Sequence, residues 1–504
     1  MTDRPVVLVF PKVSGLDVYN SKLIRAPLGV LVLATYLKQA GIPVVIVDER
    51  KEHSVCARID QILSACAPTC FAFSVMTGNQ IHFALQASRH IKKRCDVPIV
   101  WGGVHPTLEP ESTAADPNVD IVVKGEGEVP LSTLATVLRF GGSLEDVPGL
   151  CTWSSKGAFH SKPAQPVHLD SLPFVEYSLV DYTLYTEISG FFGFQHNVVF
   201  PVETSRGCPF RCSFCTEPVM NRGWRSRSPA RVVSELSVMV NRFGARSVSF
   251  VDDLFFTSHT RASEIIERLL AERLEIEWYA NVRGEYVVRH GVEFFKKART
   301  AGCRSLTLGA EAGADEVLKR VRKGLKVETI LESNRILREA GIAPHYSSII
   351  GYPFEEPEQV NETFDLAFRI LQENSGAKVS LNKLIPTPGS QVFKDCVAAG
   401  FQAPTTLEEW AGIFYTDASK WLQPQTARWL RRRTALAELI GMTNVGSRYH
   451  DLLFKIFGWH RLSGDLCFER IPGALLALGY LQSLSKAHFS RYPMFGDERS
   501  WAHR

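Results

Sequence analysis

Short apolar runs alternate with helix-like segments along the first part of the chain. The runs Val6–Phe10 and Val44–Asp48 are rich in valine and isoleucine, and a helical pattern that stops at Gly41 lies between them. The other strand candidates are Cys70–Val75, Pro98–Gly102 and Asp120–Lys124, and the helical patterns are Leu28–Ala40, Gln80–Lys93 and a stretch from Pro130. Apolar strands joined by helices predict a parallel sheet that is covered on both faces.

Glycine-containing loops follow three of these predicted strands. On a parallel sheet, ligands bind beyond the carboxyl ends of the strands. Glycine lets the backbone approach a ligand closely and turn its amides toward it. The loops are Ser74–Gly78 (SVMTG), Gly102–Thr107 (GGVHPT) and Gly125–Glu128 (GEGE). We therefore expect a ligand site at this edge of the sheet.

The alternation stops at residues 141–195 and returns at Val198. The intervening stretch carries Gly, Ser and Pro and one hairpin pattern, Cys151–Phe159, so we expect a connector and a domain boundary there. The later strand candidates are Val198–Thr204, Ser247–Asp252, Glu277–Val282, Ser305–Gly309, His345–Gly351 and Lys378–Leu384, with helical patterns at Ala230–Phe243, Arg261–Arg273, Val292–Ala301, Val327–Ala340 and Pro357–Gln372. Six such units with right-handed crossovers predict a partial or complete barrel, whose chemistry lies at the carboxyl ends of its strands.

After Phe393 the pattern becomes helical and aromatic. Residues 420–504 carry 13 Lys and Arg against 6 Asp and Glu, a larger excess than the +4 of the whole chain. The segment contains Trp421, Trp429, Arg431–Arg433, Trp459 and the apolar run Ile471–Leu481. We favour the interpretation as a helical domain with a solvated basic face. A helical lid that suits a lipid-like substrate, or a peripheral contact with an anionic membrane, is the alternative.

The patterns together predict an α/β fold in four parts. The expected parts are a parallel-sheet domain, a connector, a barrel and a helical C-terminal domain, at residues 1–140, 141–195, 196–392 and 393–504. With 504 residues, 45% of them hydrophobic and 22% charged, the chain can bury several cores, so a disordered or collagen-like chain is excluded.

Charge and cysteine usage narrow the class of protein further. The 57 Lys and Arg nearly balance 53 Asp and Glu, which argues against a dedicated nucleic-acid binder. The eleven cysteines show no disulfide framework, no signal peptide opens the chain, and the apolar runs are too short to span a bilayer. We therefore expect a cytoplasmic protein, in which clustered cysteines act as ligands or nucleophiles.

Three cysteines lie within eight residues directly after the first barrel strand. The segment reads Cys208-Pro-Phe-Arg-Cys212-Ser-Phe-Cys215. Three thiols in one tight loop suit a cuboidal iron–sulfur cluster with one iron left open for a small molecule. A zinc site is the alternative, but it needs a fourth ligand, and the nearest downstream histidine is His259. A chance group of buried thiols is the remaining interpretation.

The spacing C-x-x-x-C-x-x-C resembles the signature of the radical S-adenosylmethionine (SAM) superfamily, including the aromatic Phe214 before the last cysteine. The resemblance implies that Cys208, Cys212 and Cys215 hold a 4Fe–4S cluster, and that the amino and carboxylate groups of SAM chelate the fourth iron. Reductive cleavage of SAM would then give a 5′-deoxyadenosyl radical that abstracts a hydrogen atom from the substrate.

Later strand ends resemble the SAM contacts of this superfamily. The implied contacts are Asp252 and Asp253 (VDD) with the methionine amine, Arg283 (NVRGE) with the SAM carboxylate or substrate, Gly309 and Glu311 (GAEAG) with ribose and methionine, and Ser348 and Gly351 (SSIIGYP) with adenine. A helix cap is the alternative for Asp253, and a plain salt bridge is the alternative for Arg283.

The parallel domain ahead of the barrel resembles the cobalamin-binding subfamily of these enzymes, and the resemblance spans residues 1–390. It implies a Rossmann-like (flavodoxin-like) domain that carries the corrin at its sheet edge. The implied contacts are Ser74, Thr77, Gly78, Gly102, Gly103, His105, Gly125 and Glu126. A flavodoxin-like domain that has lost its ligand is the alternative.

One motif of many cobalamin proteins is missing. The string D-x-H-x-x-G, whose histidine coordinates cobalt from below, does not occur, and Asp48 and His53 are spaced wrongly for it. We interpret His105 as a loop hydrogen-bonder rather than an axial ligand. The sequence therefore predicts cobalamin bound without a histidine ligand.

The resemblance implies a cobalamin-dependent methyltransferase that acts on an unactivated carbon of a biosynthetic substrate, lipid-like or a natural product. A second SAM would remethylate the reduced cobalt, and a flavodoxin or ferredoxin would supply electrons. A cyclase or oxidoreductase without methyl transfer is the nearest alternative. A cobalamin-binding sensor or electron carrier is the alternative from another class, but a carrier needs only the cluster and not the SAM-like strand ends.

Overall fold

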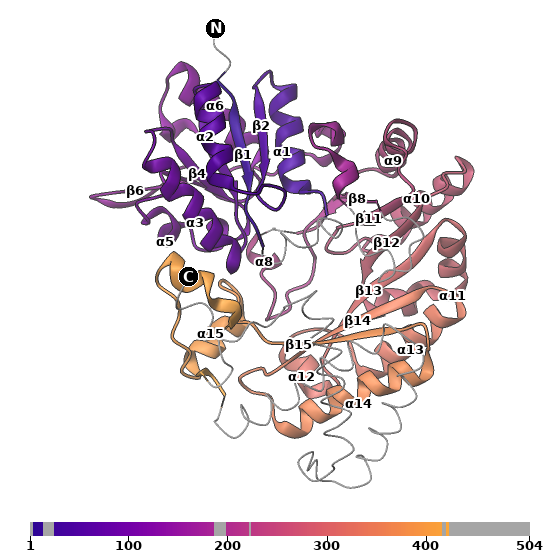
Figure 1. Ribbon diagram of the computed structural model, residues 1–504. Helices are drawn as coiled ribbons and strands as arrows, with labels where there is room; N and C mark the ends of the chain where they lie inside the picture. The colour runs from indigo at the N-terminus through magenta and orange to yellow at the C-terminus, as the bar shows by residue number, and fades with distance from the viewer. Residues whose placement is uncertain (1–3, 14–24, 186–197, 221–222, 416–419, 423–504) are drawn as a thin grey trace.

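The computed structural model describes residues 4–13, 25–185, 198–220, 223–415 and 420–422 (Figure 1). The segment predicted as a helical domain, a lid or a membrane contact, with Trp429, Arg431–Arg433, Trp459 and Ile471–Leu481, lies outside the described residues. Trp421 is described, and only 4% of its surface is exposed.

The first sheet has seven strands in the order β2-β1-β3-β4-β5-β6-β7, and its first five strands are parallel. The strands are β1 Val6–Phe10, β2 Val44–Asp48, β3 Cys70–Ser74, β4 Ile99–Gly102, β5 Ile121–Val123, β6 Leu150–Ser154 and β7 Gly157–His160. The order reverses between β1 and β3, which is the switch point where such sheets bind ligands. The predicted Rossmann-like fold is confirmed.

Both faces of the first sheet are buried, as the continuous apolar strands predict. Val6 and Leu8 pack into one core with α1 and α6, while Val7 and Val9 point into the other core with α2 and α3. The helices of this part are α1 Leu28–Gln39, α2 Val55–Ala65, α3 Asn79–Lys92, α4 Val104–Leu108, α5 Pro110–Ala114 and α6 Glu128–Phe140.

The hairpin that we expected inside a connector is part of the first sheet. β6 pairs antiparallel with β5, and β7 pairs antiparallel with β6, so residues 150–160 extend the sheet at its edge. The short elements that surround the hairpin are 3₁₀ turns, at η1 Leu144–Asp146, η2 Leu169–Ser171, η3 Tyr177–Leu179 and η4 Tyr182–Leu184.

The second sheet has six parallel strands in chain order, β8-β11-β12-β13-β14-β15, which is the partial barrel that the alternation predicts. The strands are β8 Val199–Val202, β11 Ser247–Phe250, β12 Glu277–Val282, β13 Cys303–Glu311, β14 Ala343–Ile350 and β15 Lys378–Lys383, and a short ribbon is formed by β9 Ser205–Arg206 and β10 Arg225–Ser226.

Helices cover the outer face of the barrel sheet (Figure 1). They are α9 Pro229–Phe243, α10 His259–Ala271, α11 Gly284–Thr300, α12 Asp315–Arg320, α13 Val327–Glu339 and α14 Pro357–Glu373. The short helix α8 Glu217–Met220 lies instead between the two domains, beside α4 (Figure 1). Local sequence explains the ends of the outer helices, since α9 has the N-cap Ser228, a proline at its first position and the left-handed Gly244 as C-cap. The helix α11 begins earlier than predicted and is kinked at Gly291.

After the barrel, the chain returns to the first domain. The helices α15 Gln391–Ala398 and α16 Leu407–Ala411 and the turn η5 Ile413–Tyr415 form this return segment, which lies below α3 and α5 in Figure 1. Glu408 of α16 forms an ion pair with Arg89 of α3. In the described ranges, no helix combines the length and the hydropathy that a membrane span requires.

A close backbone contact fixes the carboxyl end of β13 against α14. Gly313 donates its N–H to the Thr363 hydroxyl at 2.9 Å, and a Cβ atom on Gly313 would lie 2.1 Å from the Glu362 carbonyl oxygen. Backbone on both sides leaves no side chain that can move away, so only glycine fits there.

We therefore expect Gly313→Ala to lower the free energy of unfolding by about 1–3 kcal/mol, the usual cost of overpacking. Urea denaturation of the apoprotein measures this effect. Gly376→Ala is the matched control, because its added Cβ would meet its nearest neighbour, Asn374 Oδ1, at an ordinary 3.4 Å. Equal midpoints for the two variants would contradict the close-packing argument.

Candidate active site between the two sheets

A cavity of about 430 Å³ lies where the carboxyl ends of the two sheets face each other. Its walls come from the end of β3, from the loops after β4 and β5, from the first part of α1, and from β9, α8 and the loop after β11. Leucine, valine and methionine side chains supply much of the lining, and its charged members are Glu126, Glu128, Glu203, Arg206, Glu217 and Asp253.

Five of the residues predicted at the edge of the first sheet line this cavity. They are Ser74, Gly102, Gly103, Gly125 and Glu126. Gly103 has a φ of +97°, and a Cβ there would lie 3.0 Å from the backbone N and O of Val75, so the tight turn after β4 requires glycine.

The other three predicted residues of this edge lie outside the cavity lining. The Thr77 hydroxyl and His105 Nδ1 are 3.2 Å apart, and the His105 ring packs edge-on against Trp410 of the return segment. Burial lowers the pKa of His105 to about 3, which keeps the ring neutral. Gly78 leaves room for Phe414, because a Cβ there would overlap the Phe414 ring. These residues hold the return segment against the first domain.

The cysteine loop follows the ribbon strand β9 and is tied to two later segments. The Ser213 N–H donates to the Val321 carbonyl oxygen, and the Ser213 carbonyl accepts from the Val392 N–H, both at 2.9 Å. Cys212 is buried, while Cys208 and Cys215 are half-buried. The residues on either side of the loop, Gly207 and Glu217, line the cavity, so the three thiols lie beside it.

Burial disfavours the thiolate form of two thiols in this loop, those of Cys208 and Cys215. Burial raises the pKa of Cys208, and it raises the pKa of Cys215 to about 12. A bound metal deprotonates a coordinating thiol outright. Within the described ranges, no three His, Cys, Asp or Glu side chains converge closely enough to hold a single metal ion. A cuboidal cluster differs from such a site because it spreads its thiolate ligands over several irons.

Arg283 directly follows β12 and contacts the cysteine loop. Its guanidinium lies 3.7 Å from the centre of the Phe210 ring, and its Nη1 is 3.6 Å from Cys212 Sγ. It also forms an ion pair with Glu285 and donates to the Lys323 carbonyl oxygen. The plain salt bridge that was the alternative for Arg283 is therefore present, and the side chain also supports the predicted cluster loop.

The two aspartates after β11 have different environments. The Asp252 carboxylate is 1% exposed and accepts from the Thr204 N–H and the Ser205 hydroxyl, both at 2.6 Å. These bonds turn it toward the segment between β8 and β9, where the chain itself supplies its partners, and its contact with the SAM amine stays a prediction. Asp253 lines the cavity and accepts from the Gly207 N–H at 3.1 Å. Burial and the Glu217 carboxylate raise the pKa of Asp253 to about 7.

A buried ion pair occupies the end of β13. Glu311 and Lys323 are 2.7 Å apart, and Glu311 has a left-handed φ of +62°, which is uncommon for a residue with a side chain. A Cβ on Gly309 would lie 2.0 Å from Glu311 Oε1, so the glycine makes room for the pair. The sequence predicts that Glu311 contacts the ribose and methionine of SAM. In the structure its carboxylate is paired with Lys323.

The backbone of Gly351, which we expected to pair with adenine, already has two partners. Its N–H donates to Glu355 at 2.6 Å, and its carbonyl accepts from the Trp421 indole at 3.1 Å. Ser348 is buried, and its carbonyl accepts from Asn382 at 3.4 Å. Phe214 lies nearby, with its ring centre 6.5 Å from that of Tyr352.

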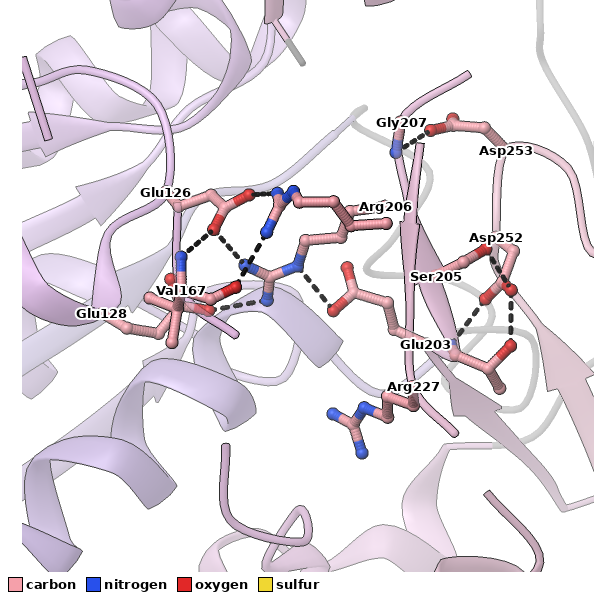
Figure 2. Close-up of polar contacts among 12 residues, drawn as sticks. Glu126, Glu128, Val167, Glu203, Ser205, Arg206, Gly207, Arg227, Asp252 and Asp253 are labelled. Carbon is pink, nitrogen blue, oxygen red and sulfur yellow. Dashed lines mark hydrogen bonds and ion pairs between the residues drawn. The ribbon is translucent and has the colours of Figure 1, made fainter. Parts of the chain in front are cut away.

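Sequence reasoning missed the charged network that joins the two sheets (Figure 2). Arg206 of β9 contacts Glu203, which precedes it on the barrel side, Glu126 in the turn after β5, and Glu128 at the start of α6. The available signal was an arginine four residues after the apolar strand β8 and two residues before Cys208. Its partners, 78 and 80 residues away in the sequence, carry no pattern that links them to it.

The donor set fits the groups that the resemblance implies. A Cβ on Gly29, which lines the cavity, or on Gly125 would have no atom within 4 Å, so both glycines border open space that a ligand can fill. The three thiols project from one loop beside that space, and three thiolates are a suitable ligand set for an iron–sulfur cluster.

Comparisons with known proteins give matches to two families. The radical SAM superfamily matches residues 202–367, and the B12 binding domain matches residues 17–135. An uncharacterized methyltransferase of Pyrococcus horikoshii is 28% identical, over 74% of this chain and 78% of that protein. An anaerobic magnesium-protoporphyrin IX monomethyl ester cyclase of Rubrivivax gelatinosus is 27% identical, over 68% of this chain and 61% of that protein.

One solved structure has the same fold over nearly the whole chain. It is the cobalamin-dependent S-adenosylmethionine radical enzyme OxsB with aqua-cobalamin and S-adenosylmethionine bound, and the two chains superpose with a TM-score of 0.70 at 18% identity. The alignment covers 98% of this chain and 82% of that one.

The absence of histidine from the described lining of the cavity leads to a prediction. After loading with cobalamin and reduction to cobalt(II), the electron-paramagnetic-resonance spectrum should show no nitrogen hyperfine splitting, because the described lining would offer no imidazole to the cobalt. Substitution of the buried His105 by Gln should leave that spectrum unchanged. Nitrogen splitting that disappears in the His105→Gln variant would make His105 the axial ligand and contradict the prediction.

Proposed function

The chain belongs to the cobalamin-binding radical SAM enzymes, and we propose that it transfers a methyl group to an unactivated carbon of a small-molecule substrate. The cofactors expected from the resemblance, a 4Fe–4S cluster, SAM and cobalamin, are confirmed by the two matching families. The main support for this proposal is the cavity. It is bordered on one side by the glycine loops of the first sheet and on the other by the ends of the cysteine loop. The methyltransferase of Pyrococcus horikoshii, which aligns over most of both chains, supports this activity.

Each part of the chain has a separate task in this proposal. SAM on the reduced cluster supplies a radical that removes a hydrogen atom from the substrate, and cobalamin supplies the methyl group. Cys208, Cys212 and Cys215 hold the cluster, with Arg283 fixing Cys212 from behind. The loops with Gly103 and Gly125 receive the corrin.

The lining of the cavity suits a reaction that has to exclude water. Leu28, Leu33, Val104 and Val251 present apolar surface toward the reacting groups. An apolar, closed site prevents side reactions of reactive species with solvent. Asp253, whose pKa is raised by burial, can accept a hydrogen bond from the methionine ammonium of SAM or donate one to a substrate oxygen, depending on its protonation.

We further propose a lipid-like or natural-product substrate, a flavodoxin or ferredoxin as the electron donor, and a reducing cytoplasm as the location. The predominantly apolar lining of the cavity supports the substrate class. A cluster with an open iron needs a reductant and protection from oxygen. These needs support a flavodoxin or ferredoxin as the donor and the cytoplasm as the compartment.

A cyclase without methyl transfer is the second candidate, because the Rubrivivax gelatinosus relative carries that name. The two candidates differ in their products. Methyl transfer yields one S-adenosylhomocysteine and one 5′-deoxyadenosine for each molecule of substrate that gains a methyl group. Cyclisation yields 5′-deoxyadenosine and no methylated product.

We expect reconstituted protein to form both products from SAM, and we expect Cys212→Ala to abolish cluster binding and 5′-deoxyadenosine formation. Iron content, the cluster absorption band and chromatography of the SAM products measure these effects. The control is Cys56→Ala on α2, which removes a half-buried thiol from the first domain. Retained SAM cleavage in the Cys212 variant would overturn the cluster assignment, and 5′-deoxyadenosine alone in the wild-type protein would favour the cyclase.

A further inference from the structure

Arg206 binds three carboxylates from two domains at once (Figure 2). Its Nη1 lies 3.1 Å from Glu126 Oε2, its Nη2 lies 2.6 Å from Glu128 Oε1, and its Nε lies 2.8 Å from Glu203 Oε2. The Arg206 side chain is 11% exposed and that of Glu128 is 3% exposed, so water screens this group little. The planar guanidinium can satisfy three acceptors in fixed directions.

A second arginine holds the same turn. Arg225 pairs with Arg206 across the β9–β10 ribbon, forms an ion pair with Glu126, and donates to the Val167 carbonyl at 2.9 Å. The Val167 N–H in turn donates to Glu126 Oε2 at 3.3 Å. The ribbon of the barrel therefore holds the turn after β5 and the connector together.

The backbone at Arg206 leads straight into the predicted cluster loop. Gly207 follows, its N–H donating to Asp253 at 3.1 Å, and Cys208 comes next. The partners Glu126 and Glu128 flank Gly127 at the edge of the first sheet, in the wall of the cavity. One side chain thus connects the start of the cysteine loop to the loop that borders the predicted corrin site.

We propose that Arg206 is a positioning residue that sets the distance between the cluster loop and the cobalamin-carrying edge of the first sheet. The expected effect on catalysis rests on the proposed function. The positioning of the two domains by Arg206 does not depend on it. A displacement of about 1 Å between reacting groups can lower a rate about a hundredfold, so a fixed separation matters for a transfer between two cofactor sites.

The three ion pairs of Arg206 also predict that lysine cannot replace it. A lysine keeps the charge but is a point donor without the planar fork, so it cannot hold Glu126, Glu128 and Glu203 in these directions. Glutamine removes the charge and leaves three carboxylates facing one another. One oxygen of Glu128 already has no hydrogen-bond partner among the described residues, so the network has no spare donor.

The test compares Arg206→Lys and Arg206→Gln with Arg335→Gln. Arg335 is the matched control because it also binds three glutamates, Glu328, Glu332 and Glu373, but all of them belong to α13 and α14 on the outside of the barrel. Hydrogen exchange of the apoproteins reports on residues 125–128 and 205–215. Pulsed electron paramagnetic resonance of the loaded, reduced proteins reports the distance between the cluster and cobalt(II). Product analysis reports the ratio of 5′-deoxyadenosine to methylated substrate.

We expect both Arg206 variants to exchange faster at the two segments, to broaden the cluster-to-cobalt distance distribution, and to raise the product ratio by about tenfold or more, while Arg335→Gln matches the wild type. An unchanged distance distribution in Arg206→Lys, with no more than a lowered melting temperature, would overturn the proposal and leave Arg206 a stabilising residue. If Arg206→Gln does not fold, Arg206→Lys and Glu128→Gln decide the question. Absence of methylated product from the wild type would refute the proposed function, and the distance distribution would still decide the positioning role.

Discussion

Parallel strands place all of their carboxyl ends at one edge of a sheet, and this chain brings two such edges to face each other across one cavity. Each sheet alone offers a row of loops without a second wall. Facing each other, they enclose a space that the loops after β4 and β5 border on one side and the ends of the cysteine loop border on the other. The location of the cavity follows from this constraint.

Much of this architecture could be predicted from the sequence because buried parallel strands are continuous apolar runs. The predicted limits of β1, β2 and β12 agree with the structure to the residue. The loops with Gly103 and Gly125 and the cysteine loop were also located correctly beside the cavity, since loops at strand ends are placed by topology alone.

Pairing between distant side chains could not be predicted in this way. Asp252 was expected at the SAM amine, and in the structure Thr204 and Ser205 donate hydrogen bonds to its carboxylate. The Gly351 backbone was expected to pair with adenine, and in the structure Glu355 and Trp421 bind both of its polar groups. The role of Arg206 depends on Glu126 and Glu128, and nothing in a single sequence associates residues so far apart. Three-dimensional packing decides these contacts, whereas local pattern decides the strands.

The return segment has a further consequence for motion. The chain leaves the first domain through the connector before β8 and comes back to it at Phe414, whose ring fills the space beside Gly78. The first domain is therefore held at two distant stretches of the barrel chain, by Arg206 and Arg225 just after β8 and by the return segment after β15. A displacement of the cavity wall at one of these stretches is resisted at the other, so the width of the cavity depends on both.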